Sequence, residues 1–172
     1  MTTKASRPAA KKTNGSTRAD PATKLLMADH KEVHAMFQQY KKLADADAEA
    51  SEREALATEI CHALTVHATV EEELFYPAAR EAEVDADLLD EAEVEHASAK
   101  ELIAQIEGMS PEDDLYDAKV TVLGEYIDHH VKEEEGELFP KCRKSDMDLE
   151  GLGAAMTARK AELAAEMAEM AA

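Results

Sequence analysis

Two segments of the chain repeat one pattern of polar residues. HATVEEELFYP spans residues 67–77 and HVKEEEGELFP spans residues 130–140, and each places a His ten residues and a Glu six residues before a Pro. A His and a Glu four residues apart lie about 40° apart around a helix, so their side chains point in one direction. The pattern predicts two helices that each direct one imidazole and one carboxylate to the same side.

Apolar residues recur with helical spacing in four segments after residue 20. In the first of them Leu26, Val33 and Phe37 share one face, and His30 lies within that stripe. Similar stripes run through residues 51–80, 85–108 and 112–143. Four amphipathic helices joined by short connections are typical of an all-α, up-and-down four-helix bundle. The sequence GLG at 151–153 is expected to separate a short, Ala- and Met-rich C-terminal helix.

Composition divides the chain into three parts. Residues 1–22 are basic and contain almost no large apolar side chain, so we expect a disordered tail that buries too little surface to order itself. We assign residues 23–146 to the four-helix domain and residues 147–172 to a helical extension.

The charge balance bears on partners and on location. The formal net charge is −19, which disfavours nucleic acids and anionic membrane surfaces, and no stretch is apolar enough to span a bilayer. The two cysteines, Cys61 and Cys142, are too few for a disulfide framework and suit a reducing compartment. We expect a cytoplasmic monomer or homodimer that binds neither nucleic acid nor membrane.

The first and third of the four predicted helices also share a pattern. Asp29-His30 is followed seven residues later by Phe37, and Glu95-His96 is followed seven residues later by Ile103. The repeating unit is thus a helix with a central His followed by a helix with His-x-x-x-Glu. Aligning the two prolines pairs His67 with His130 and leaves His129 opposite a Val, so His129 is expected to lie at the surface or beside the ligands.

These buried polar positions predict a metal site. Burying imidazoles and carboxylates without partners costs several kcal/mol for each charged group, and a bound cation would supply the missing positive charge. Nitrogen and oxygen donors without thiolates favour iron or manganese and permit zinc, and six donors suit two ions better than one. The predicted ligands are His30, His67, Glu71, His96, His130 and Glu134.

The segments ADHKEVHAMF, HATVEEELFYP, VEHASAKELI and HHVKEEEGELFP, in that order, resemble the hemerythrin family, specifically bacterial hemerythrin-like proteins with the HHE cation-binding domain. The resemblance covers residues 24–145. It implies a four-helix bundle with a non-haem di-iron centre, in which the six residues above are the ligands and both glutamates are bridges. Iron is favoured over manganese and zinc.

The chain departs from the oxygen-carrying hemerythrins in two respects. Those proteins carry a second His four residues after the third-helix ligand, where this chain has Lys100, and they end with an aspartate bridge in place of His-x-x-x-Glu. His34 lies four residues after His30 and is a candidate for an additional ligand. The tyrosines are expected to be packing residues, and the one nearest the metals is a candidate hydrogen-bond donor.

The expected function is binding of O2 or a related small ligand, NO or peroxide, for sensing, storage or detoxification. Two alternatives stay open: a di-iron enzyme that turns over peroxide or NO, and a non-redox metal-binding or interaction module. A dedicated enzyme is the less favoured of these interpretations.

Overall fold

The computed structural model describes residues 18–172, and all regular structure within that range is helical. Most of the predicted tail, residues 1–22, lies outside the described residues. Helix α1 begins at Pro21, where Asp20 caps the helix by accepting a hydrogen bond from the Thr23 backbone N–H.

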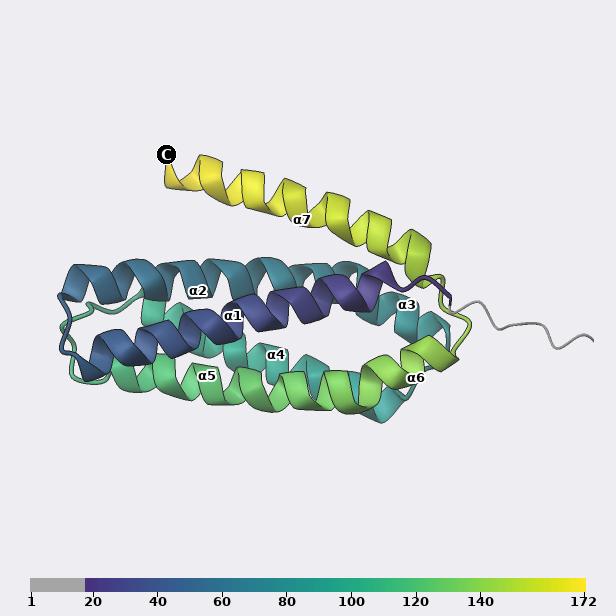
Figure 1. Ribbon diagram of the computed structural model, residues 1–172, viewed down its shortest axis with the longest axis horizontal. Coiled ribbons are helices and arrows are strands. Elements are labelled where there is room, and N and C mark those ends of the chain that lie inside the picture. Colours follow the sequence, from purple (N-terminus) through teal and green to yellow (C-terminus); the bar gives the residue numbers. More distant parts are fainter. Residues whose placement is uncertain (1–17) are drawn as a thin grey trace, which may run out of the picture.

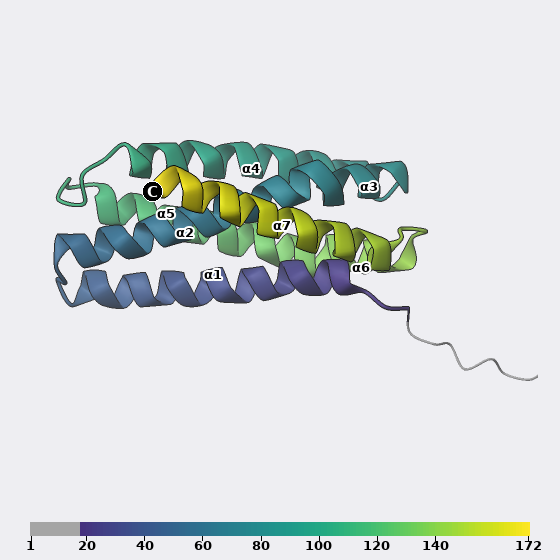
Figure 2. The same ribbon diagram turned by 90° about the horizontal axis from the view of Figure 1, so that it is seen from above.

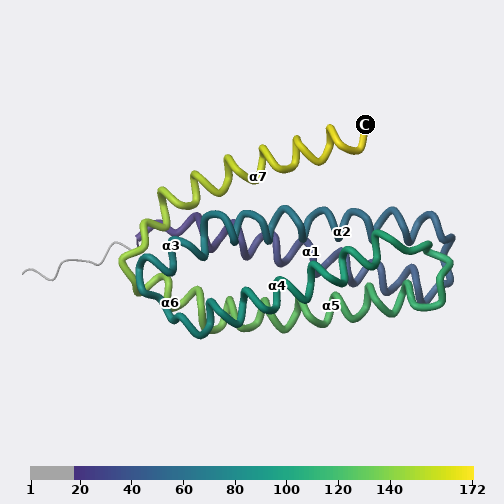
Figure 3. The backbone as a smooth tube through the Cα atoms, turned by 180° about the vertical axis from the view of Figure 1, so that it is seen from behind, coloured from purple at the N-terminus to yellow at the C-terminus, as the bar shows by residue number. Residues whose placement is uncertain are grey.

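Four long helices form an up-and-down bundle, which confirms the predicted fold class (Figure 1). Their ranges are α1 Pro21–Asp45, α2 Ala50–Val70, α4 Ala86–Glu107 and α5 Tyr116–Glu133. The short helices α3 (Tyr76–Glu81) and α6 (Phe139–Lys144) continue α2 and α5 at one end of the molecule (Figure 3).

A π-helical turn interrupts each of the two helices that carry His-x-x-x-Glu. These turns, η1 (Glu71–Phe75) and η2 (Glu134–Leu138), begin at the Glu of the motif. A proline ring clashes with the carbonyl four residues before it in a regular α-helix, and a wider turn relieves that clash. Both turns precede a proline, Pro77 or Pro140. The segments predicted as helical over 51–80 and 112–143 therefore each contain a π turn that the apolar spacing did not indicate.

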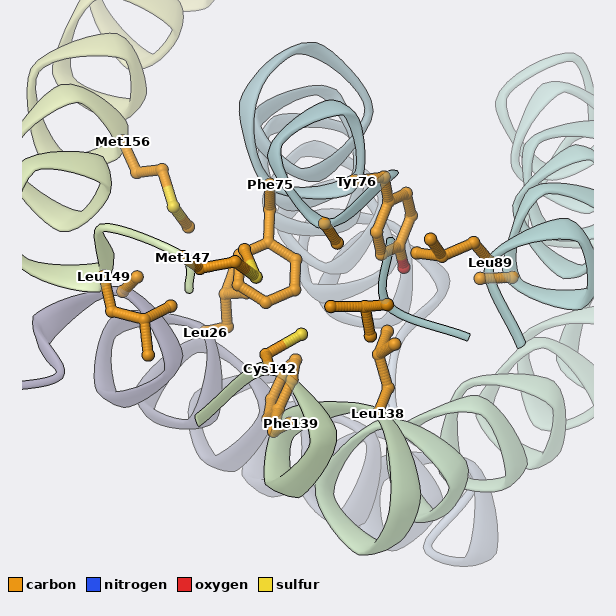
Figure 4. Packing of buried hydrophobic residues seen from close by; sticks show 14 of the residues in the cluster. Leu26, Phe75, Tyr76, Leu89, Leu138, Phe139, Cys142, Met147, Leu149 and Met156 are labelled. Atoms are coloured by element: carbon orange, nitrogen blue, oxygen red, sulfur yellow. The ribbon is translucent and has the colours of Figure 1, made fainter. Parts of the chain in front are cut away.

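Two apolar clusters fill the bundle, one toward each end. The cluster beside α3 and α6 includes Leu26, Phe75, Leu138 and Phe139 (Figure 4), and the other includes Val33 and further residues of α1, α2, α4 and α5. Along α1, His30 falls between Leu26 of one cluster and Val33 of the other. The buried histidines and glutamates thus form a polar layer between two apolar regions.

Helix α7 (Leu149–Ala171) crosses the outside of α1 and α2 (Figure 2). Contrary to the sequence-based expectation, the GLG sequence lies inside this helix and the helix is long, with 23 residues. A Cβ on Gly153 would stand 2.8 Å from the backbone nitrogen of Ala22. This glycine therefore allows the start of α7 to approach the start of α1, which a larger residue would prevent. Over the described range, no helix is long and apolar enough to cross a lipid bilayer.

Candidate metal centre

Each of the four long helical segments brings predicted ligands to the polar layer. His30 comes from α1, His67 and Glu71 from α2 and its π turn, His96 from α4, and His130 and Glu134 from α5 and its π turn. All six side chains are buried. Their donor atoms fall into two groups, in each of which the atoms lie within 4.8 Å of one another.

The first group contains His30, His67, Glu71 and Glu134. Nε2 of His30 lies 3.2 Å from Nε2 of His67 and 3.3 Å from Oε2 of Glu134. Nε2 of His67 lies 3.1 Å from Oε1 of Glu71.

The second group contains Glu71, His96, His130 and Glu134. Nε2 of His96 lies 3.2 Å from Nε2 of His130 and 3.1 Å from Oε2 of Glu71. Nε2 of His130 lies 2.9 Å from Oε1 of Glu134. Each glutamate therefore has one oxygen in each group, so both carboxylates join the two groups.

These spacings fit two cations. Donor atoms about 2.1 Å from one ion and at right angles to each other stand about 3.0 Å apart. Oε1 of Glu71 and Oε2 of Glu134 are buried, and among residues 18–172 neither has a hydrogen-bond partner, although an imidazole nitrogen lies near each. Buried carboxylate oxygens without a hydrogen bond are costly, and a cation between the donors would satisfy them.

In the absence of metal, protonated imidazoles balance part of the negative charge of the buried carboxylates. Burial lowers the pKa of His67, but Glu71 and Asp29 outweigh this effect and raise the pKa to about 10. For His130, burial is likewise outweighed by Glu134 and Glu95, and the pKa is raised to about 11. His67 and His130 therefore carry protons when no metal is bound. A cation that binds their Nε2 atoms displaces those protons.

Comparison with known proteins identifies this arrangement. Residues 22–142 match the family described as "Hemerythrin HHE cation binding domain". The chain belongs to that family. The predicted resemblance is confirmed, and the HHE domain accounts for most of the chain and for a metal cofactor held by its His and Glu clusters.

Two known proteins are similar to this HHE domain. A crystal structure of a hemerythrin HHE cation-binding domain-containing protein from Mycobacterium kansasii matches with a TM-score of 0.68 and 23% identity, covering 84% of this chain and 87% of that one. A protein from Nostoc sp. named DNA nickase is 28% identical over 134 residues, which are 77% of this chain and 37% of that protein. The chain thus spans little more than a third of the length of that relative.

A second layer of carboxylates orients the HHE imidazoles. Nδ1–H of His67 donates to Asp29 at 3.0 Å, and Nδ1–H of His130 donates to Glu95 at 2.9 Å. Each of these carboxylates directly precedes the His of the neighbouring helix, in the Asp-His and Glu-His pairs of the repeat. Such hydrogen bonds fix the tautomer and direct Nε2 toward the metal. Sequence reasoning noticed the two pairs but missed this role.

The outer layer of the other two imidazoles is uneven. Nδ1–H of His30 donates to Glu135 at 3.0 Å. The equivalent carboxylate, Glu72, lies 3.8 Å from Nδ1 of His96 and instead accepts from Lys100 at 2.6 Å. Over the described residues, Nδ1 of His96 has no hydrogen-bond partner.

Tyr76 is the tyrosine that lies at the metal centre. Its hydroxyl donates to Oε1 of Glu134 and lies 3.2 Å from Glu71 Oε2 and from Nε2 of both His96 and His130. Burial, followed by the charges of the two glutamates, holds the pKa of this hydroxyl well above its usual range. The repeat places Phe139 at the equivalent position, where it stacks on the ring of His30.

The two remaining candidate histidines lie apart from both groups. His34 is 53% exposed and its Nδ1 contacts Asp128 at 3.2 Å, so the structure does not bring it to the ligands. His129 is exposed and contacts Glu133 at 3.2 Å rather than any of the four central imidazoles. Cys61 and Cys142 are buried free thiols outside both groups.

A small cavity adjoins the four central histidines, and Tyr76 is not among its lining residues. Its volume is about 60 Å³, and all four central histidines contribute to its wall. The remaining wall is largely apolar and includes Val33, Leu64, Ile103 and Ile127. The HHE domain therefore offers a small, largely apolar space that is bounded in part by the four central histidines.

Proposed function

We propose that the HHE domain holds two iron ions and binds O2 or a related small ligand, NO or peroxide, for sensing, storage or detoxification. The observation that carries the proposal is the position of the two buried glutamates, each with one oxygen in each group of donors. His30 and His67 would complete one position, and His96 and His130 the other. An iron pair held in this way supplies electrons to a small oxidising ligand.

The donor set supports iron. Imidazole and carboxylate donors with no thiolate in either group suit iron or manganese, while zinc is a competitor that availability in the cell can favour. Two carboxylates offset part of the charge of two divalent ions, so the buried centre would carry only a modest net charge.

The cavity supports a ligand of two or three atoms. Pockets for drug-sized ligands are typically about 300–1,000 Å³, so a cavity of about 60 Å³ suits a ligand of a few atoms better than a large organic substrate. Its apolar walls favour a ligand that is weakly hydrated, such as O2 or NO.

The number of imidazoles supports detoxification or sensing over reversible oxygen transport. Lys100 stands where the oxygen carriers have a ligand, and His34, the candidate replacement, contacts Asp128 at the surface. A centre with four imidazoles and two carboxylates keeps more positions open to water or ligand. The second candidate function, turnover of NO or peroxide by the same centre, rests on the same observation.

Anaerobic reconstitution with Fe(II) tests the proposal. We expect close to two irons per chain by mass spectrometry, and a new visible absorption band on addition of O2, NO or peroxide. A binding protein consumes the ligand in proportion to protein, whereas an enzyme consumes it continuously. Protein that retains no iron after gel filtration, or iron-loaded protein that gives no spectral change with any of the three ligands, would contradict the proposal.

DNA nicking is not part of this proposal. The name belongs to a protein of which this chain covers 37%, and the net charge of −19 opposes binding to a phosphate backbone.

A further inference from the structure

Helix α7 reaches the outer layer of the metal centre through one lysine. Lys160 donates from Nζ to Oδ1 of Asp29, while Oδ2 of Asp29 accepts from Nδ1 of His67 at 3.0 Å. A chain of contacts therefore runs from α7 through a carboxylate to a candidate ligand of the first group. Helix α7 lies beyond residues 22–142, the part of the chain that matches the family.

The buried position of Asp29 makes its second partner important. Asp29 is 7% exposed, so its charge is poorly solvated and interacts strongly with whatever it contacts. With Lys160 present, the negative charge is divided between an ammonium group and an imidazole N–H. Without Lys160, the whole charge would act on His67, which would then donate more electron density to the metal.

The other half of the centre lacks this cation. Glu95, the equivalent of Asp29, also accepts from a central imidazole, His130. Glu133 and His129 lie next to it, with one donor atom of each within 4.8 Å of the others, and among the described residues no lysine or arginine forms an ion pair with Glu95. Lys160 therefore acts on one half of the centre, and the twofold repeat does not supply it.

We propose that Lys160 is a positioning residue of the metal centre, which holds Asp29 against His67 and limits the negative charge that Asp29 lends to that imidazole. This inference rests on the proposed iron centre. Its consequence is that α7 raises the reduction potential of the iron in the first group. Loss of Lys160 stabilises the ferric form of that iron.

The neighbouring residue provides a matched control. Arg159, also on α7, donates to Glu73 at 2.7 Å and 3.2 Å. Glu73 is 44% exposed and, within the described part of the chain, contacts none of the four central histidines. Arg159→Met therefore removes an ion pair between α7 and the bundle without touching the Asp29–His67 hydrogen bond.

The test is a redox titration of iron-loaded, full-length protein. Lys160→Met should shift the Fe(III)/Fe(II) equilibrium of one iron toward Fe(III) by about tenfold, the order by which changing an outer partner of a ligating imidazole alters a metal site. Lys160→Arg and Arg159→Met should stay close to wild type. Asp29→Asn should shift the equilibrium in the opposite direction, and adding Lys160→Met to that variant should have little further effect.

The outcomes separate this inference from the proposed function. Wild-type protein without bound iron would end both. Iron-loaded wild type, with Lys160→Met indistinguishable from Arg159→Met, would overturn the role of Lys160 and leave the iron centre intact. A Lys160→Met shift that persists unchanged in the Asp29→Asn background would also overturn it, because the effect would not pass through Asp29.

Discussion

The two halves of the candidate metal centre have equivalent candidate ligands and different surroundings. The first half contains His30 and His67, the second contains His96 and His130, and Glu71 and Glu134 belong to both. Around the first half lie Phe139 and outer carboxylates, one of which, Asp29, accepts a hydrogen bond from Lys160. Around the second lie Tyr76 and a carboxylate layer without that lysine.

The comparison distinguishes the repeated donor residues, which metal binding requires, from the unrepeated outer residues, which adjust the chemistry of the metal. The sequence repeat reproduces the donor atoms at equivalent positions, as the proposed pair of cations requires. The second layer departs from the repeat at Tyr76, at Lys100 and at Lys160, and each departure changes the charge or the hydrogen bonding of one half. Two equally ligated ions in this protein would therefore differ in reactivity.

Removing a shared carboxylate should break both halves at once. Glu71→Ala takes one oxygen from each group, and we expect metal affinity to fall by at least about 100-fold, since loss of an outer partner alone costs about 10- to 100-fold. Metal content after gel filtration measures the effect. Glu72→Ala, which removes the next carboxylate, should keep its metal, and equal losses in both variants would show that Glu71 is not a ligand.

Removing one imidazole should break one half. His130→Ala should cost the ion of the second group and about half of the bound metal, and His67→Ala should do the same for the first group. His129→Ala and His34→Ala should keep the wild-type content, because both side chains lie at the surface. Mass spectrometry of the reconstituted variants distinguishes these results, and a loss in His34→Ala would restore that residue as a ligand.

Replacing Tyr76 should make the second half resemble the first. Tyr76→Phe keeps the ring and removes the hydroxyl that donates to Glu134, so we expect a loss of about 1–2 kcal/mol in the free energy of unfolding of metal-free protein. Urea denaturation measures it. Tyr126→Phe, at an exposed tyrosine, should change the stability by less than about 0.5 kcal/mol. Equal effects of the two substitutions would mean that the Tyr76 hydroxyl contributes nothing to folding.

Releasing Glu72 from Lys100 should make the two halves more alike, and this substitution should have the smallest effect of the series. Lys100→Ala removes an exposed ion pair worth about 0–1 kcal/mol and allows Glu72 to accept from Nδ1 of His96, as Glu135 does from His30. We expect iron release to a chelator to become slower, while Lys41→Ala, at a remote exposed ion pair, leaves it unchanged. Faster release from Lys100→Ala would show that the lysine supports the ligands.

The predictable part of the site rests on helix geometry. A four-residue spacing fixes the relative direction of His67 and Glu71 whatever surrounds them, and the repeat selects His130 over His129. The burial of polar residues on apolar stripes then requires a compensating charge. For these reasons the bundle and the six converging side chains could be predicted from the order of residues alone.

Contacts between helices could not be predicted in this way. The spacing of His34 from His30 suggests a ligand, but the rotation of α1 in the bundle turns His34 toward Asp128. Tyr76 stands apart from the other tyrosines by its place in the repeat, directly before Pro77, but that place does not show which way its side chain points. Only the packing of the start of α3 against α4 and α5 directs its hydroxyl between the donors.

The amino-acid sequence by itself determined the helical fold, the twofold repeat and the donor atoms, because these depend on spacing within single helices. The tertiary structure alone decided that Asp29 serves His67, that Gly153 brings α7 against α1, and that Lys160 reaches Asp29 from 131 residues away in the chain. Such pairings depend on how helices rotate and cross, and side-chain packing across the whole bundle sets those quantities.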